Sequence, residues 1–287
     1  MPSAFLRILN IHCIGLQHMV VSLVLALALV GVQNAGAQTF DDAKAAYKRG
    51  DYAIALESFR NLAELGDTRA QFALGSMYAE GKGVLQDEAE AVRWYRRAGE
   101  EGLVGVQLLL GTMYDSGEGV PQDYAEAARW YRLAAEQGDA RAQVNLGYMY
   151  SQGRGVSQDY AEAVGWFRQA AEQGNAKGQT RLGIMYEQGY GVPRDYTEAR
   201  RWYHLAAAQG NAFAQASLGF MHYLGKGVSK DYVQAHKWFS LAISRFSSSE
   251  RDSQDRAVQF LEKVASNMTP EQIAEAERLA SEWQPAQ

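Results

Sequence analysis

A Leu-Gly pair returns every 36 residues along the middle of this chain. The five copies begin at Leu74, Leu110, Leu146, Leu182 and Leu218, and no insertion disturbs the interval. A Gly-x-Gly-Val motif, a tryptophan and an aspartate keep the same spacing. Repetition this regular predicts a repeat architecture, in which each unit buries its apolar face by stacking on its neighbours.

Each 36-residue unit is predicted to fold as two helices joined by the glycine motif. In the first copy, residues 68–80 carry apolar side chains at helical spacing, and Gly81 ends that helix. The second helix begins at Asp87, which caps its first turn, with Glu90 placed to complete a capping box. The later copies repeat this pair as Asp123/Glu126, Asp159/Glu162, Asp195/Glu198 and Asp231/Gln234.

One glycine in each unit, such as Gly75, lies inside the first helix. A glycine in a helix interior costs about 1 kcal/mol relative to alanine, so its recurrence indicates that a neighbouring group excludes bulk. We expect that group to be the tryptophan of the second helix. Replacing one of these tryptophans with alanine is expected to cost roughly 3–5 kcal/mol. The tryptophans are Trp94, Trp130, Trp166, Trp202 and Trp238.

Four sequence blocks together resemble the Sel1-like repeat family, which is related to the tetratricopeptide repeats. The blocks are Leu-Gly-x-Met-Tyr, Gly-x-Gly-Val, Asp-Tyr and Ala-x-x-Trp followed by Tyr or Phe, within residues 68–246. The resemblance implies an all-α fold, a right-handed superhelical solenoid of antiparallel α-hairpins. The last copy departs from the pattern at His222 and Phe246, which indicates that the array ends there.

The segments on either side of the repeats are predicted to be caps, because a terminal hairpin otherwise exposes an apolar face. Residues 40–66 resemble a tetratricopeptide-like hairpin, and residues 247–287 are predicted to form capping helices. Thr269, followed by proline and by Gln272 three residues later, predicts the start of the last helix. The five repeats are predicted to span residues 67–102, 103–138, 139–174, 175–210 and 211–246.

Residues 1–37 are predicted to be a bacterial secretory signal peptide. They contain one charged residue, Arg7, and an apolar run over residues 19–32, followed by the small residues Ala35, Gly36 and Ala37. This order is typical of cleavage after Ala37, so we expect the mature chain in the periplasm or outside the cell. Two alternatives stay open: the segment is retained as an N-terminal anchor, or translation starts at Met19 instead of Met1.

The sequence offers no convergent set of catalytic groups, and we predict no enzyme activity, no metal ion and no cofactor. The single cysteine, Cys13, lies in the predicted signal peptide. His204, His222 and His236 stand at unrelated points of the repeat and lack the spacing of metal ligands. The net charge of −5, with lysine and arginine spread along the chain, disfavours nucleic acid as a partner.

Positions that differ between the copies are the expected recognition residues. On the first helix these are the equivalents of positions 72, 76 and 79, with position 73 beside them. The resemblance implies that this helix lines a concave surface, where exposed aromatic and arginine side chains are typical anchors for a protein partner. Packing of these side chains between neighbouring hairpins is the alternative. The candidate binding residues are Asn145, Tyr148, Arg181, Ile184, Phe220 and Tyr223.

The predicted function is that of an exported adaptor. It would hold a peptide, loop or helix of another protein in the concave groove and regulate a cell-envelope or signalling complex. The regulatory role rests on the family resemblance, because a fold alone does not establish a function. The alternative is a ligand-binding protein or enzyme acting on peptidoglycan or a related compound, and that reading requires a deep pocket with polar groups.

Overall fold

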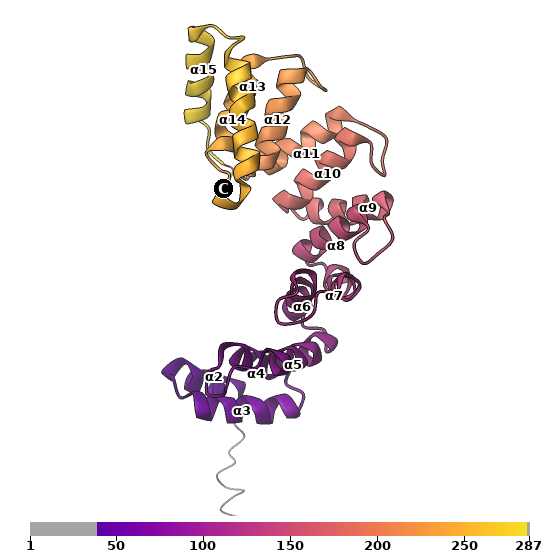
Figure 1. The fold of residues 1–287 in the computed structure, drawn as a ribbon, viewed down its shortest axis with the longest axis vertical. Coiled ribbons are helices and arrows are strands. Elements are labelled where there is room, and N and C mark those ends of the chain that lie inside the picture. Colours follow the sequence, from indigo (N-terminus) through magenta and orange to yellow (C-terminus); the bar gives the residue numbers. More distant parts are fainter. Residues whose placement is uncertain (1–38, 286–287) are drawn as a thin grey trace, which may run out of the picture. The chain divides into compact units, whose positions relative to one another are not determined.

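The structure, a computed structural model, describes residues 39–285, so the predicted signal peptide lies outside the described residues. These residues form α-helices and one short 3-10 helix, with no strand among them (Figure 1). The predicted all-α fold is therefore confirmed. The helices are α2 (Phe40–Arg49), α3 (Tyr52–Glu64), α4 (Thr68–Glu80), α5 (Glu88–Glu100), α6 (Val104–Ser116), α7 (Tyr124–Glu136), α8 (Ala140–Gln152), α9 (Tyr160–Glu172), α10 (Ala176–Gln188), α11 (Tyr196–Ala208), α12 (Ala212–Leu224), α13 (Tyr232–Ile243), η1 (Ser248–Glu250), α14 (Arg251–Ala265) and α15 (Pro270–Ser281).

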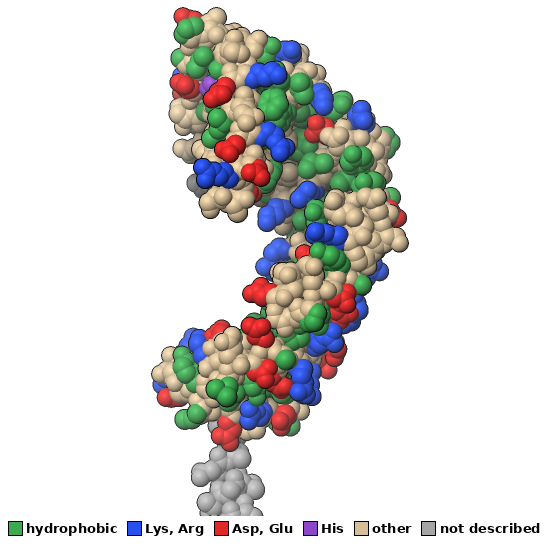
Figure 2. All heavy atoms as spheres, in the orientation of Figure 1, with side chains coloured by type: hydrophobic (Ala, Val, Ile, Leu, Met, Phe, Trp, Pro, Cys, Tyr) green, Lys and Arg blue, Asp and Glu red, His purple; other side chains and the backbone are tan. Residues whose placement is uncertain are grey.

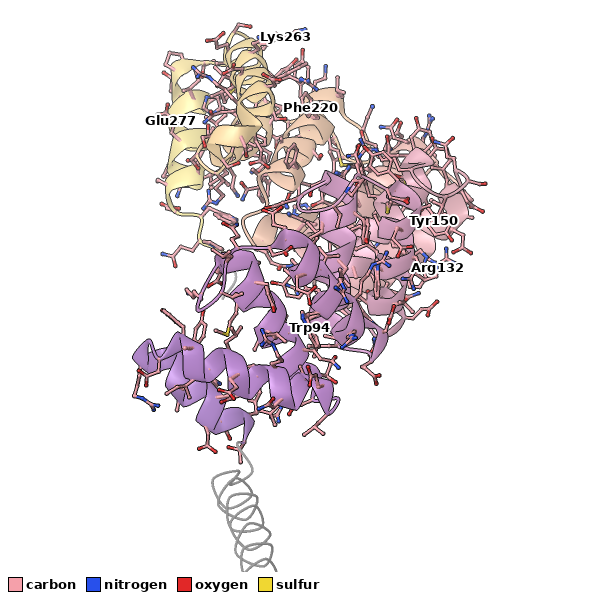
Figure 3. The ribbon with its side chains drawn as sticks, turned by 60° about the horizontal axis from the view of Figure 1, so that its bottom comes forward. Trp94, Arg132, Tyr150, Phe220, Lys263 and Glu277 are labelled. Atoms are coloured by element: carbon pink, nitrogen blue, oxygen red, sulfur yellow. The ribbon has the colours of Figure 1, made fainter. Side chains whose placement is uncertain are left out.

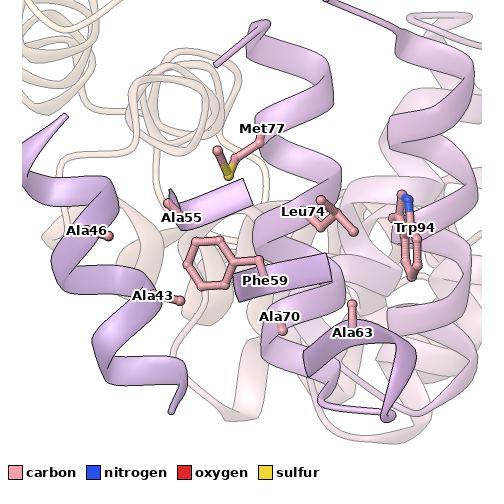
Figure 4. Packing of buried hydrophobic residues seen from close by; sticks show 9 residues of the cluster. All are labelled: Ala43, Ala46, Ala55, Phe59, Ala63, Ala70, Leu74, Met77 and Trp94. Carbon is pink, nitrogen blue, oxygen red and sulfur yellow. The ribbon is translucent and has the colours of Figure 1, made fainter. Parts of the chain in front are cut away.

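The described residues divide into two compact units, residues 39–94 and residues 95–285. The core of the first unit is built around Phe59 of α3, which is 3% exposed (Figure 4). Small residues of α2, Ala43 and Ala46, and Leu74 of α4 pack in the same cluster. Burying a phenylalanine side chain contributes about 1.5–3 kcal/mol, which holds these short helices together.

The second unit contains most of the repeat array. We call the first helix of each repeat helix A and the second helix B, so that α6, α8, α10 and α12 are A helices and α7, α9, α11 and α13 are B helices. Each A helix packs against the B helix of its own repeat, and α8, α10 and α12 also pack against the B helix before them. The last pair, α14 and α15, continues this packing on α13.

The repeated aspartate caps helix B as predicted, but the expected capping box is absent from the described repeats. In the third repeat, Asp159 Oδ1 accepts hydrogen bonds from the backbone N–H groups of Ala161 and Glu162, at 2.9 and 3.0 Å. The backbone N–H of Asp159 donates to the carbonyl of Tyr150 at 3.0 Å, so it is not free for the glutamate. The capping box predicted at Thr269 and Gln272 does form.

The two glycines of the Gly-x-Gly-Val motif have different roles. Gly225 has φ +71° and ends α12 in the left-handed conformation. Gly227 has φ +66°, and a Cβ there would lie 2.6 Å from the Cβ of Tyr196, at the start of helix B in the preceding repeat. The second glycine therefore allows the loop of one repeat to rest directly on its neighbour.

The glycine inside helix A faces the aromatic residue that follows the tryptophan. A Cβ at Gly183 would lie 2.6 Å from the ring of Tyr203, and one at Gly147 would lie 2.8 Å from the ring of Phe167. The prediction that the tryptophan excludes bulk there is therefore wrong. The tryptophans instead join cores between repeats, as Trp202 does by packing in one cluster with Phe167 and residues of α10.

A buried glutamine links the helices of successive repeats. Gln143 of α8 donates to the carbonyl of Ala135 in α7 at 3.2 Å and accepts from Gln173, at the end of α9, at 2.8 Å. Buried amides need such partners, because an unpaired polar group in the interior costs free energy. The equivalent residues Gln107, Gln179 and Gln215 each donate to a backbone carbonyl of the preceding helix B.

An arginine–tyrosine hydrogen bond also ties helix B of one repeat to helix A of the next. Arg168 Nη2 donates to the hydroxyl of Tyr186 at 3.0 Å, and Arg132 makes the same bond to Tyr150 (Figure 3). In each case the tyrosine follows the arginine by 18 residues. Arg60 with Tyr78 and Arg96 with Tyr114 complete the series.

Candidate protein-binding surface

The A helices of the second unit each expose one narrow face. The most exposed positions in α10 are Lys177, Arg181, Ile184 and Gln188, which are spaced by four, three and four residues and so share one face. The same positions are exposed or half-buried in α6, α8 and α12, and the matching positions of α14 are exposed. We call these residues the A-helix stripe: Gly105, Leu109, Thr112, Ser116, Arg141, Asn145, Tyr148, Gln152, Lys177, Arg181, Ile184, Gln188, Phe213, Ser217, Phe220, Leu224, Asp252, Arg256, Gln259 and Lys263.

Stripe residues of neighbouring A helices meet between α8 and α10. These two helices are in direct contact, and the Arg181 guanidinium lies 5.2 Å from the centre of the Tyr148 ring. Farther along, the stripe residue Phe220 of α12 meets Phe260 of α14, with 4.6 Å between ring centres. The stripe is therefore one surface over α8 and α10, and its α12 part adjoins α14.

Three of the candidate residues lie on α8 and the adjacent part of α10. Asn145 and Tyr148 are half-buried, and Arg181 is exposed. Asn145 also contacts the hydroxyl of Tyr131, whose pKa is raised, chiefly by burial. The Arg181 guanidinium lies over the ring of Tyr148, an arrangement favoured by the attraction between a cation and an aromatic face.

The other three candidate residues contribute more to packing between hairpins than to open surface. Ile184 packs against the cluster formed by α11, α12 and α13. Phe220 touches both Phe239 and Phe260, and Tyr223 lies 6.1 Å from the ring of Phe260. Tyr223 is one position away from the stripe. Packing between hairpins, the alternative kept open from the sequence, describes these three residues well.

The exposed face of helix A is rotated relative to the predicted one. Val144, Thr180 and Ala216, which occupy the position equivalent to 72, are 8%, 6% and 8% exposed. In these three repeats the flanking position, equivalent to 73, is the more exposed of the two, whereas in the first copy Phe72 itself is 40% exposed. Variation between copies at the buried position therefore reflects local packing.

Sequence comparison of the repeats missed several cations that lie on the stripe or beside it. Arg256 and Lys263 belong to α14, which lies outside the five repeats. Arg154, in a glycine loop, lies 5.8 Å from the Tyr148 ring and 5.0 Å from the Tyr124 ring. The sequence pattern that could have located the two cations of α14 is the helical spacing of its exposed polar residues, which matches that of the stripe in the A helices.

Two histidines replace the arginine–tyrosine pair at one junction. His204 and His222 are 18 residues apart, on α11 and α12, which is the separation of the arginine and tyrosine in the earlier pairs. The prediction that they occupy unrelated points of the repeat is therefore wrong. Burial lowers the pKa of both imidazoles, and the nearby cations Arg200 and Lys237 lower it further.

Two other kinds of functional feature, a metal centre and a membrane span, are not found among the described residues. Within residues 39–285, no three His, Cys, Asp or Glu side chains come together as ligands for a metal ion. No helix in that range has both the length and the apolar character needed to cross a bilayer. The A-helix stripe is thus the surface with the most features of a binding site.

Comparisons with known proteins agree with this architecture. A family model described as the Sel1 repeat matches five segments: residues 68–103, 106–139, 140–175, 176–211 and 212–245. The chain is similar to a Sel1 repeat protein from Oxalobacter formigenes, whose crystal structure superposes with a TM-score of 0.70 at 28% identity. That match covers 84% of this chain and 98% of that one.

Two further relatives are matched over part of their length. The chain is 36% identical to c5321, a protective antigen of uropathogenic Escherichia coli strains with an SLR fold, with a TM-score of 0.54. That match covers 79% of this chain and 56% of c5321. An exopolysaccharide production negative regulator of Rhizobium leguminosarum bv. viciae is 48% identical over 48 residues, which are 17% of this chain and 18% of that regulator.

Proposed function

Because this chain belongs to the Sel1 repeat family, whose helical hairpins generally mediate contacts between proteins, we propose that it is an adaptor. It binds a segment of another protein along the A-helix stripe. The stripe presents side chains from several rigid helices, so the partner is bound with little change in the backbone of this chain.

The contrast between neighbouring positions of helix A carries the proposal. Leu110, Leu146, Leu182 and Leu218 are identical and completely buried, so this position serves the scaffold. The position before it lies on the stripe and holds leucine, asparagine, arginine and serine in the same four repeats. A surface that differs at each step along a repeated scaffold is suited to recognising one particular partner.

The site of action and the regulatory role are parts of the proposal. The signal-like composition of residues 1–37 supports export, so the adaptor would work in the periplasm or outside the cell. The Rhizobium relative is described as a negative regulator of exopolysaccharide production, which supports a role in controlling a cell-envelope or signalling complex.

Site-specific photo-crosslinking in cells tests the proposal. A photoreactive residue is placed at Gln152 or Gln188, both exposed on the stripe, and at Arg129 or Arg201 of the B helices as matched controls. We expect a discrete protein adduct from the stripe probes, to be identified by mass spectrometry, and none from the controls. Adducts from the helix B probes alone, or no protein adduct from any probe, would refute the proposed function.

A further inference from the structure

We propose that the A-helix stripe recognises an acidic segment of its partner that carries one apolar anchor residue. The inference rests on the proposed function and adds the chemistry of the bound segment. Three features of residues 95–285 support it: the charge of the stripe, the availability of two arginines, and an apolar recess between them.

The stripe is basic, although the chain as a whole is acidic. Its twenty residues include five basic ones and one acidic one, Asp252, which leaves 23 basic and 32 acidic residues in the rest of the chain. Figure 2 shows several Lys and Arg side chains gathered beside α8 and α10. A local positive surface on a negative protein attracts carboxylates and disfavours basic partners.

Two stripe arginines are available to bind carboxylates. Arg181 and Arg256 are exposed, and neither forms an ion pair within residues 39–285. Arg141 is different, because Asp139 holds its guanidinium at 3.1 Å. An arginine guanidinium binds a carboxylate through two parallel hydrogen bonds, which provides both affinity and orientation.

The stripe of α12, between these arginines, is apolar. Phe213 is 42% exposed and Leu224 is 50% exposed, which is unusual for such large apolar side chains. A cavity of about 140 Å³ opens beside Phe213, lined by Phe213, Phe220, Phe246 and Arg256 among others. A cavity of about 150 Å³ accommodates a benzene molecule, so this recess has room for one leucine or phenylalanine side chain.

The spacing of the helices sets the spacing of the recognised residues. Arg181 belongs to α10 and Arg256 to α14, the A-type helices on either side of α12 in the array. An extended peptide rises about 3.3 Å per residue, so a short segment lying across α12 would extend toward both arginines. We therefore expect two acidic residues several positions apart, with a leucine or phenylalanine between them.

A protein segment fits this arrangement better than a continuous polyanion does. A nucleic acid or an acidic polysaccharide would place negative charge over Phe213 and Leu224, where α12 offers no cation on the stripe. A peptide with an apolar side chain between two carboxylates matches the order of the stripe residues, which are basic on α10, apolar on α12 and basic on α14.

Selection from a display library of random 12-residue peptides on the purified chain, residues 38–287, tests the inference. We expect enrichment of peptides that carry acidic residues around a leucine or phenylalanine. The best peptide, labelled with fluorescein, should bind Arg181→Glu and Arg256→Glu at least 10-fold more weakly than the unaltered chain. Lys230→Glu, a charge reversal at an exposed residue outside the stripe, should change the affinity less than twofold.

Three results would overturn the inference. The first is that the library yields basic or neutral peptides, or none. The second is that neither arginine reversal weakens the affinity for the peptide, in variants that keep the helical circular dichroism spectrum. The third is that the peptide binds equally well after its apolar anchor is replaced by serine. Equal competition by heparin would point to a generic polyanion site. A neutral or basic segment cross-linked to Gln188 would leave the proposed function standing and refute only its chemistry.

Discussion

Two glycines of the third repeat, Gly147 and Gly165, both lie inside helices but have different surroundings. A Cβ at Gly147 would meet the ring of Phe167 at 2.8 Å and the carbonyl of Ala163 at 3.2 Å, whereas a Cβ at Gly165 would meet nothing within 4 Å. Gly147→Ala is therefore expected to lower the free energy of unfolding by about 1–3 kcal/mol, measured by urea denaturation.

Gly165→Ala is the matched control for that substitution. Its new methyl group enters open space, and alanine restricts the unfolded chain, so we expect a gain of about 0.4–1 kcal/mol. The two changes in the free energy of unfolding need not be equal in size. A loss of stability in Gly165→Ala, or a gain in Gly147→Ala, would contradict the packing described around these helices.

The His204–His222 pair predicts stability that depends on pH. Burial lowers both pKa values in the folded chain, while unfolded histidine titrates near pH 6.5. The folded state thus binds these protons more weakly. The free energy of unfolding should fall as the pH drops from above about 6.5 through the lowered pKa values. Arg200 and Lys237 add to this loss, and Asp231 opposes it at His222.

Thermal unfolding between pH 7.5 and 5.5 measures this effect. The double variant His204→Arg, His222→Tyr restores the residue types of the other junctions and should lose less stability over that range than the unaltered chain. Burial also lowers the pKa of His236 on α13, but this residue is present in both proteins, so its contribution cancels in the comparison. An identical pH dependence of the unaltered chain and the double variant would contradict the account.

At the scale of helices, the buried glutamines Gln107, Gln143, Gln179 and Gln215, here called the glutamine ladder, join successive repeats. Gln143→Leu removes the donor to the Ala135 carbonyl and the acceptor for Gln173, while the Ala135 carbonyl keeps the bond from the backbone N–H of Gly138 at 2.9 Å. We expect a loss of about 1 kcal/mol in the free energy of unfolding. Gln152→Leu, at an exposed position of the same helix, should change it by no more than about 0.5 kcal/mol. Similar effects at both positions would mean that the ladder adds little.

Most helices were predictable from the sequence because their boundaries depend on local chemistry. The capping aspartates and the left-handed glycines act within a few residues of each helix end, so spacing alone locates them. The partner of the glycine inside helix A was not predictable in this way. Whether Trp202 or Tyr203 faces Gly183 depends on the rotation of helix B, and the two adjacent aromatic residues point in different directions.

The candidate surface was predictable in part. Comparison of the copies selected Asn145, Tyr148 and Arg181, which lie on the stripe, but it also selected the buried positions Val144 and Thr180. It did not separate residues open to solvent from those pressed between hairpins, such as Ile184. That distinction depends on the distance between repeats, which no single repeat encodes.

At the scale of the molecule, a repeat array should unfold locally. Phe260 of α14 contacts Phe220 and Phe239, so Phe260→Ala should cost about 3 kcal/mol. Because each repeat contacts only its neighbours, hydrogen exchange should accelerate in α12 to α15 and stay unchanged in α6 and α7. Phe260→Leu should show a smaller effect. Acceleration spread equally over residues 95–285 would indicate a single cooperative unit.

The central claim is that the A-helix stripe binds the partner, and blocking that surface tests it most directly. The affinity of the cross-linked partner is measured for Gln152→Trp and Gln188→Trp, which add bulk to the stripe without changing its charge. Ala161→Trp and Thr197→Trp add at least as much bulk at exposed positions of helix B. We predict binding at least 10-fold weaker for the stripe variants and within twofold of the unaltered chain for the helix B variants. Weaker binding by the helix B variants alone, or no change in any of the four, would contradict the account.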